Sequence, residues 1–129
     1  MKLYVDDLRK CPDGWHLART VTEAIRVLAT MPVEEVSLDH DISHAVEVNG
    51  LARPYPCGET FEPVAWYLRE MAQRQNGREQ FGPRRIVLHT ANAIGAEKMR
   101  NILYHYYDNI VIKLGSPVNG LEEKAGDGG

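Results

Sequence analysis

The sequence predicts an α/β fold, a three-layer sandwich in which a parallel sheet of four to five strands lies between helices. Four short apolar runs rich in branched residues have the composition of strands buried on both faces. Between these runs, apolar residues recur at the spacing of amphipathic helices. Strands that alternate with helices pair in parallel through right-handed crossovers, with helices over both faces of the sheet. This order of elements is typical of a flavodoxin-like domain.

The expected strands are residues 3–5 (LYV), 36–38 (VSL), 86–88 (IVL) and 110–112 (IVI). None of them shows the alternation of apolar and polar residues that is typical of a half-exposed strand. The segment HLARTV, residues 16–21, is a weaker candidate for a fifth strand.

Three helices are expected between the strands. The first follows Thr20 or Thr22 as its N-cap, and Glu23 stands three residues after Thr20, as in a capping box. Each helix is indicated by one apolar face: Val21, Ala24, Ile25 and Leu28 in the first, Phe61, Val64, Ala65, Leu68, Met71 and Ala72 in the second, and Met99, Ile102, Leu103 and Tyr106 in the third.

The chain is expected to form one α/β domain over residues 1–115, followed by a flexible C-terminal tail over residues 116–129. A length of 129 residues is enough for one hydrophobic core and short for two. The tail contains NGLEEKAGDGG, which is Gly-rich and charged and has no apolar period. Residues 42–59 (ISHAVEVNGLARPYPCGE) are longer than an ordinary strand-to-helix connection, and such loops are often lids or substrate-binding loops.

Composition excludes several classes of protein. The chain is 43% hydrophobic and 26% charged, as is usual for globular proteins, and its net charge of −3 leaves no basic surplus for an extended nucleic-acid surface. We find no signal-peptide pattern and no apolar run near the roughly 20 residues that cross a bilayer. Cys11 and Cys57 do not make a disulfide framework, so a cytoplasmic protein without membrane contact is expected. No base is placed near Cys57 by sequence spacing, and its role stays open.

Polar and charged residues stand at the ends of the four expected strands. Ligands of open parallel sheets bind at the carboxyl ends of the strands, and parallel pairing places those ends at one edge. The residues expected to meet there are Asp6 and Asp7, Asp39, His40 and Asp41, His89 and Thr90, and Lys113.

The residue types in this predicted cleft favour metal and phosphate chemistry. Carboxylates crowded together do not all ionise without a compensating cation. Mg²⁺ or Mn²⁺, which prefer oxygen ligands, are the ions expected for Asp6, Asp7 and Asp39. His40 or His89 could then move a proton to or from a water molecule or a leaving oxygen, because imidazole titrates near neutrality.

Each of these residues also has a structural interpretation. The acids after the first strand could form a turn, and Asp41 could be a turn or cap residue. His89 could be a hydrogen-bonded core histidine. Asn92, in the segment HTAN, could be only the N-cap of the third helix, or its amide could orient a phosphate. Lys113 is uninformative alone, but within the cleft it could neutralise a phosphoryl group.

The segments LYVDDLRKCPDGW, ARTVTEAIRVL, VSLDHDI and IVLHTANAIGAEKM, taken in this order, resemble the cyclic-phosphate processing receiver-like family. These proteins are compact relatives of the two-component receiver domain, and the resemblance extends from Leu3 to Leu103. Members are thought to act on cyclic or terminal phosphates of nucleotides. The resemblance implies a site made of Asp6, Asp7, Asp39, His40, Asp41, His89 and Asn92.

The same positions also match the general receiver plan, with two acids for a metal ion, Asp39 as phosphate acceptor, and Thr90 with Lys113 as a switch pair. The residues His40 and Asp41 depart from that plan, because a phosphate acceptor needs neither a second acid nor a base beside it. His89 also stands where a receiver normally has an apolar residue.

The sequence departs from the cyclic-phosphate family as well. Thr90 stands where serine is usual, and Ala93 where a proline often follows the asparagine. The segment 42–60 is enlarged and contains PYPCGETF. These departures leave the substrate open.

The function expected from these residues is that of a metal-dependent phosphoesterase, a hydrolase of cyclic phosphates on nucleotides or RNA-type ends. Catalysis is expected from His40, His89, Asp39 and Asp41, substrate binding from Asn92, Thr90 and Lys113, and metal binding from Asp6, Asp7 and Asp39. Water is the expected nucleophile, and attack by Asp39 to form an aspartyl-phosphate is the alternative mechanism. The expected partner is a small cyclic nucleotide or phosphate-ended nucleotide.

Two other functions fit the same residues. One is a receiver-type switch that accepts phosphate on Asp39, and the other is a sensor that binds a cyclic nucleotide without turnover. The sequence does not decide which histidine is the acid or base.

Overall fold

The computed structural model describes residues 1–48, 51–75 and 82–115, and the side chains of residues 43–48, 51–58 and 75 are outside the description. The predicted tail, residues 116–129, lies outside the described residues. The elements are β1 (Lys2–Val5), β2 (His16–Ala18), α1 (Val21–Thr30), β3 (Glu35–Leu38), β4 (Asp41–Val48), β5 (Leu51–Thr60), α2 (Glu62–Gln75), β6 (Arg85–Thr90), α3 (Ala93–Leu103) and β7 (Ile110–Leu114).

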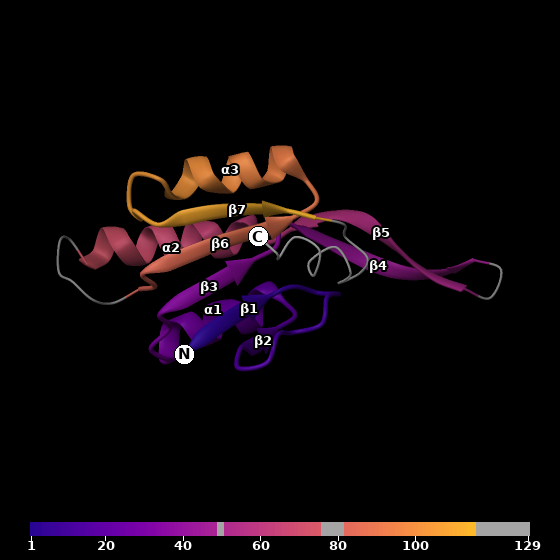
Figure 1. Ribbon diagram of the computed structural model, residues 1–129, viewed down its shortest axis with the longest axis horizontal. Coiled ribbons are helices and arrows are strands. Elements are labelled where there is room, and N and C mark those ends of the chain that lie inside the picture. Colours follow the sequence, from indigo (N-terminus) through magenta and orange to yellow (C-terminus); the bar gives the residue numbers. More distant parts are fainter. Residues whose placement is uncertain (49–50, 76–81, 116–129) are drawn as a thin grey trace.

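The main sheet has five parallel strands in the order β2-β1-β3-β6-β7 (Figure 1). This order confirms the predicted α/β fold with a receiver-like, flavodoxin-like parallel sheet. The weak fifth strand candidate is present as the short edge strand β2. The carboxyl ends of β1, β3 and β6 are therefore neighbours, with β3 in the middle.

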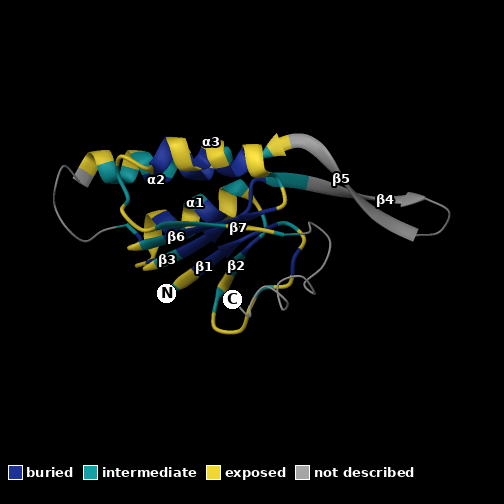
Figure 2. Cartoon of the chain, turned by 45° about the horizontal axis from the view of Figure 1, so that its top comes forward, coloured by how far each residue is buried: buried dark blue, intermediate teal, exposed yellow. Residues whose placement is uncertain are grey.

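The layering differs from the expected sandwich, because α1, α2 and α3 lie side by side on one face of the sheet (Figure 2). Each of these helices connects a strand to one further along the sheet in the same direction, and right-handed crossovers in one direction place all helices on one face. The step from β1 to β2 runs the other way. Its connection, residues 6–15, contains no helix, so the described part of the chain has two layers.

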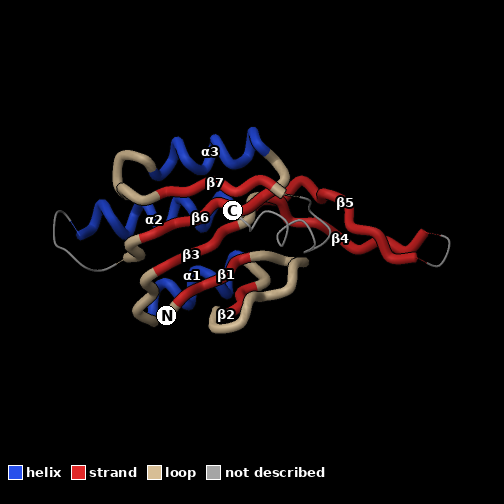
Figure 3. Tube along the Cα trace, in the orientation of Figure 1, coloured by secondary structure: helices blue, strands red, loops and turns tan. Residues whose placement is uncertain are grey.

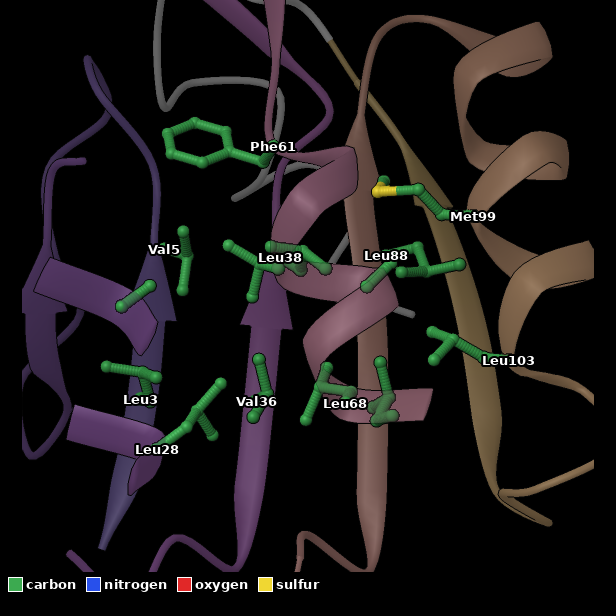
Figure 4. Packing of buried hydrophobic residues seen from close by; sticks show 14 of the residues in the cluster. Leu3, Val5, Leu28, Val36, Leu38, Phe61, Leu68, Leu88, Met99 and Leu103 are labelled. Atoms are coloured by element: carbon green, nitrogen blue, oxygen red, sulfur yellow. The ribbon is translucent and has the colours of Figure 1, made fainter. Parts of the chain in front are cut away.

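The hydrophobic core lies between the helices and one face of the sheet (Figure 4). Successive side chains of a strand point to opposite faces, so alternate strand residues share the face that the helices cover. These buried residues are Leu3 and Val5, Val36 and Leu38, and Ile86 and Leu88, which pack with Leu28, Leu68, Met99 and Leu103 from the helices and with Phe61. The same alternation places Tyr4, Ser37 and His89 on the other face.

The segment predicted as a long loop is an antiparallel hairpin of β4 and β5, which projects from one end of the sheet (Figures 1 and 3). Asp41 pairs with Thr60 at its base. Part of the strand signal was present, because Ile42, Val46 and Val48 stand an even number of residues apart, but two prolines and a glycine in residues 51–60 are atypical of strands. The role of this segment and of Cys57 falls on side chains outside the description.

Both described helix N-caps follow the sequence prediction. The Thr20 hydroxyl accepts the Glu23 backbone N–H at 3.1 Å, and the Glu23 carboxylate accepts the Arg19 N–H at 2.9 Å. The Asn92 side chain caps α3 by accepting the Gly95 N–H at 2.8 Å. None of the helices in the described ranges is both long and apolar enough to cross a membrane.

Candidate functional site

The structure brings Asp6, Asp39 and His89 together at the carboxyl edge of the sheet. Asp6 directly follows β1, Asp39 directly follows β3, and His89 lies one residue before the end of β6. All three are buried. Two groups of residues form at this edge: the acid cluster (Asp6, Asp7 and Asp39) and the His40 cluster (His40, Asp41, Glu62, Asn92 and Gly95).

The Asp6 carboxylate is held as an anion by four hydrogen bonds. Its Oδ1 accepts the backbone N–H groups of Leu8 at 2.8 Å and Arg9 at 2.9 Å. Its Oδ2 accepts from Arg9 Nη1 and from His89 Nε2, each at 2.8 Å. Burial alone raises the pKa of Asp6, but the hydrogen bonds from His89 and from the backbone outweigh it and hold the pKa well below its usual range.

Asp39 has the opposite balance. Burial raises its pKa most and the negative charge of Asp6 raises it further, to about 7. The nearby guanidinium, with Arg9 Nη1 3.5 Å from Asp39 Oδ2, opposes this rise only in part. Hydrogen bonds from the His40 N–H, at 2.7 Å, and from Thr90 act in the same direction as Arg9. One guanidinium is therefore not enough to keep both carboxyl groups ionised at neutral pH.

The acid cluster fits a hard divalent cation. One carboxylate oxygen from each of Asp6, Asp7 and Asp39 lies within 4.8 Å of the others. Oxygen donors of this kind suit Mg²⁺ or Mn²⁺. The raised pKa of Asp39 supports the fit, because a carboxyl group that is hard to ionise beside Asp6 is stabilised as an anion by added positive charge.

His89 is engaged on both nitrogens and on its ring face. The ionised Asp6 can only accept, so in the neutral ring Nε2 carries the proton and Nδ1 accepts from the Ser37 hydroxyl at 2.7 Å. The ring stacks on Tyr4, with 4.6 Å between ring centroids and 4° between planes. Both hydrogen-bond partners are buried, so His89 is placed to orient Asp6.

His40 lies between two carboxylates. Its Nδ1 is 2.7 Å from Asp41 Oδ1, and its Nε2 is 2.7 Å from Glu62 Oε2. The ring is buried, but the Asp41 and Glu62 side chains are 35% and 27% exposed. The His40 carbonyl also accepts the Phe61 N–H at 2.8 Å, which ties the residue to the start of α2. The cluster is therefore a buried imidazole with partly exposed acids at both nitrogens.

Asn92 and Gly95 shape the other side of the His40 ring. Asn92 Nδ2 donates to Asp41 Oδ1 at 3.2 Å while its Oδ1 caps α3 through Gly95. A Cβ atom added at Gly95 would lie 2.5 Å from His40 Cγ and Nδ1, a distance that real contacts do not show. The ring therefore packs directly on the backbone of α3, and only glycine leaves the space.

Lys113 lies on the strand next to the one that carries His89, but it has no contact with either cluster among the described residues. Its side chain is exposed on β7, paired in register with His89, and it forms no ion pair within the described part of the chain. Thr90 is buried beside Asp39, and its hydroxyl accepts the Asn92 N–H at 3.1 Å. Thr90 is thus part of the wall that connects the acid cluster to the His40 cluster.

Three functional candidates were not found in the sequence: Arg9, Glu62 and Gly95. Arg9 stands three residues after Asp6, and a tight turn can bring two residues at this spacing into contact. The sequence did not predict the geometry of the loop after Asp6, so this contact was missed. Glu62 looked like an ordinary acid in the first turn of a helix. A glycine inside a helical pattern is a signal for close packing, and this signal was present at Gly95.

The two roles of Asn92 can be separated by substitution. We expect Asn92→Ala to lower the free energy of unfolding by about 1 kcal/mol, because the α3 cap is lost. Asn92→Ser keeps a good capping hydroxyl and loses only the amide that donates to Asp41, so it should stay within about 0.5 kcal/mol of the wild-type protein. Urea unfolding of both variants checks this, and equal losses would show that capping is not what Asn92 contributes.

The comparison with known families agrees with this geometry. A family model described as the cyclic-phosphate processing receiver domain matches residues 1–105, which run from β1 through α3. Searches of curated proteins and of solved structures gave no match. The match covers most of the chain and includes both the acid cluster and the His40 cluster. The chain therefore belongs to the cyclic-phosphate processing receiver domain family.

Proposed function

We propose that the protein is a metal-dependent phosphoesterase that opens a cyclic phosphate of a nucleotide or of an RNA-type end. The observation that carries the proposal is the junction of the two clusters. Asp39, whose pKa is about 7, hydrogen-bonds through its carboxylate to the N–H of His40, the residue at the centre of the second cluster. The proposed cation site and the residue of the proposed proton-transfer group are thus joined by a backbone contact.

The acid cluster would hold the metal ion. Asp6, Asp7 and Asp39 would bind Mg²⁺ or Mn²⁺, which supplies Lewis acidity toward a phosphate oxygen and makes a water molecule easier to deprotonate. Arg9, already 2.8 Å from Asp6 and 3.5 Å from Asp39, contributes further positive charge beside the phosphate. His89 holds Asp6 in place from the opposite side.

The contacts favour His40 over His89 as the general acid or base. The partners of His89 are buried, whereas the Nδ1 partner of His40, the Asp41 carboxylate, reaches solvent and can pass on a proton. Asp41, itself held by Asn92, orients the His40 ring at Nδ1. This arrangement supports Asp41 as an orienting residue and Asn92 as its support rather than as a phosphate ligand.

Water is the favoured nucleophile. Asp39 is a poor one, because its oxygens face the His40 N–H and the Arg9 guanidinium and would also be held by the metal ion. The receiver-type alternative, with phosphate accepted on Asp39, would require this carboxylate to be exposed to a donor, and it is buried. A hydrolytic reaction needs only a water molecule beside it.

The proposal is tested by incubating the protein with Mg²⁺ or Mn²⁺ and a panel of 2′,3′- and 3′,5′-cyclic nucleotides and oligonucleotides ending in a cyclic phosphate. We expect ring opening of at least one class, observed by phosphorus NMR, to stop on addition of EDTA and to resume when the metal is restored.

The control is His105→Ala, which removes an exposed histidine outside both clusters and should leave turnover unchanged. Stable labelling of Asp39 by a small phospho-donor, with no ring opening across the panel, would establish the switch instead. Tight binding of a cyclic nucleotide without product would establish the sensor.

A further inference from the structure

The two carboxylates that contact His40 are not held alike. Asp41 receives a second contact from Asn92, whose amide donates to both of its oxygens at 3.2 and 3.4 Å, and Asn92 is in turn fixed as the cap of α3. The Glu62 carboxylate has one contact within the described residues, the one to His40 Nε2. Asp41 is therefore the fixed partner of the ring, and Glu62 is the partner that can leave.

The ring itself has little freedom to move away from Glu62. Gly95 Cα packs against the ring so closely that no Cβ fits between them, and the His40 carbonyl is bonded to the Phe61 N–H. A ligand that needs a nitrogen of His40 must then come to the ring where it stands. Because Nδ1 is held by Asp41, the nitrogen that a ligand can reach is Nε2.

We propose that Glu62 Oε2 marks a subsite for an anionic oxygen of the ligand, and that Glu62 occupies this subsite until a phosphate oxygen displaces it. A carboxylate oxygen 2.7 Å from Nε2 is a close chemical match for a phosphate oxygen accepting the same hydrogen bond. The choice of phosphate as the ligand of this subsite rests on the proposed function.

The position of Glu62 supports an anion subsite. Glu62 is the first residue of α2, and α3 begins two residues before Gly95, so the N-termini of both helices meet at the His40 ring. Helix N-termini carry partial positive charge and favour anions. When Glu62 turns away, His40 Nε2 faces the place that its carboxylate leaves. Glu62 is 27% exposed, so its side chain can turn toward solvent.

The subsite can be tested without any turnover, by titrating the protein with inorganic phosphate in the presence of Mg²⁺ and following amide signals by NMR. We expect Glu62→Ala to bind phosphate roughly 10-fold or more tightly than the wild-type protein, because a competing acceptor and a like charge are both removed. Glu62→Gln keeps the acceptor and loses only the charge, so it should bind more tightly than the wild-type protein and less tightly than Glu62→Ala.

The matched control is Glu70→Ala, which removes an exposed acid from the same helix, where Glu70 pairs with the exposed Arg74, and should leave phosphate affinity unchanged. Phosphate affinity of Glu62→Ala or Glu62→Gln equal to or below that of the wild-type protein overturns the proposal. The amide spectrum of each variant reports whether the fold is kept.

Kinetics separate this inference from the proposed function. With a cyclic phosphate that is turned over, Glu62→Ala should lower KM, whereas Asp41→Ala should lower kcat, because it removes the residue that orients the ring. A fall of kcat in Glu62→Ala with KM unchanged would make Glu62 a proton-transfer partner and overturn the subsite. If no cyclic phosphate is opened but Glu62→Ala and Glu62→Gln bind phosphate more tightly, the phosphoesterase fails and the subsite stands.

Discussion

Asp39→Asn is expected to raise the free energy of unfolding at pH 8 by roughly 2 to 4 kcal/mol and to abolish stabilisation by divalent cations. Asp39 is buried beside the ionised Asp6, and these two causes raise its pKa from 3.8 to about 7. Asparagine has nearly the same shape without the charge. The buried charge of Asp39 favours metal binding but lowers the stability of the fold. The substitution should therefore increase stability and abolish metal binding.

The pH dependence follows from the direction of this shift. Because the folded pKa of Asp39 lies above the unfolded value, Asp39 binds more protons in the native state between pH 4 and pH 7, and its contribution to wild-type stability falls as pH rises through this window. Above pH 7 the shift corresponds to a stability gain of at most roughly 4 kcal/mol when the charge is removed. The gain measured for Asp39→Asn should be smaller, because Arg9 loses an ionic partner. Near pH 3 the advantage of Asp39→Asn should vanish, because the carboxyl group is then protonated in both states.

Urea unfolding at pH 3, 5 and 8 in EDTA measures the stability difference, and thermal unfolding with and without Mn²⁺ measures the metal response. We expect the wild-type melting temperature to rise with Mn²⁺ and that of Asp39→Asn to stay constant. Asp108→Asn, at an exposed position outside the site, is the control and should retain wild-type behaviour. A loss of stability in Asp39→Asn at pH 8, or an intact response to Mn²⁺, would contradict the metal site.

Gly95→Ala is expected to reduce turnover of a cyclic phosphate by about 10²- to 10⁴-fold, as much as His40→Ala does. The added methyl group would lie 2.5 Å from His40 Cγ and Nδ1, so the ring must leave its place between Asp41 and Glu62. Overpacking of this kind costs about 1 to 3 kcal/mol, and the better helix propensity of alanine returns at most about 1 kcal/mol. A net loss of stability is therefore expected.

A double-mutant cycle isolates the contact. When His40→Ala has removed the ring, the three atoms nearest to the added methyl group are gone, and Gly95→Ala should raise the free energy of unfolding by about 0.5 to 1 kcal/mol. The effect of one substitution thus changes sign with the presence of the imidazole, which urea unfolding of the four proteins can measure. Additive effects in the cycle would mean that the His40 ring is not packed on α3.

Local pattern was sufficient for most of the elements. The three apolar stripes were largely read correctly, because helix periodicity depends on residues only three or four positions apart. Phe61 and Tyr106, the outermost residues of two stripes, lie just outside α2 and α3. The N-caps at Thr20 and Asn92 were also predictable, since a capping side chain bonds to a backbone N–H of the next turn. Parallel order then predicted that Asp6, Asp39 and His89 would lie at one edge.

The layering and the hairpin were harder to predict for different reasons. The number of layers depends on the direction of each crossover along the sheet. The sequence does not show that β2 is the edge strand next to β1, so this direction could not be predicted. The strands β4 and β5 pair with each other and not with the main sheet, so each is an edge strand. Edge strands tolerate proline and glycine, which is why these residues did not prevent a hairpin here.

By itself, the sequence determined the helices, the strands of the main sheet, the parallel α/β class and the set of acids and histidines that gather at the strand ends, because all of these follow from local periodicity and strand polarity. Only the tertiary structure decided how the charges are paired: Arg9 between Asp6 and Asp39, Glu62 at His40 Nε2, and Gly95 beneath the ring. The physical reason is range. Hydrogen bonds and steric contacts are decided within about 1 Å, and residues far apart in the chain reach that precision only after packing has fixed their backbones.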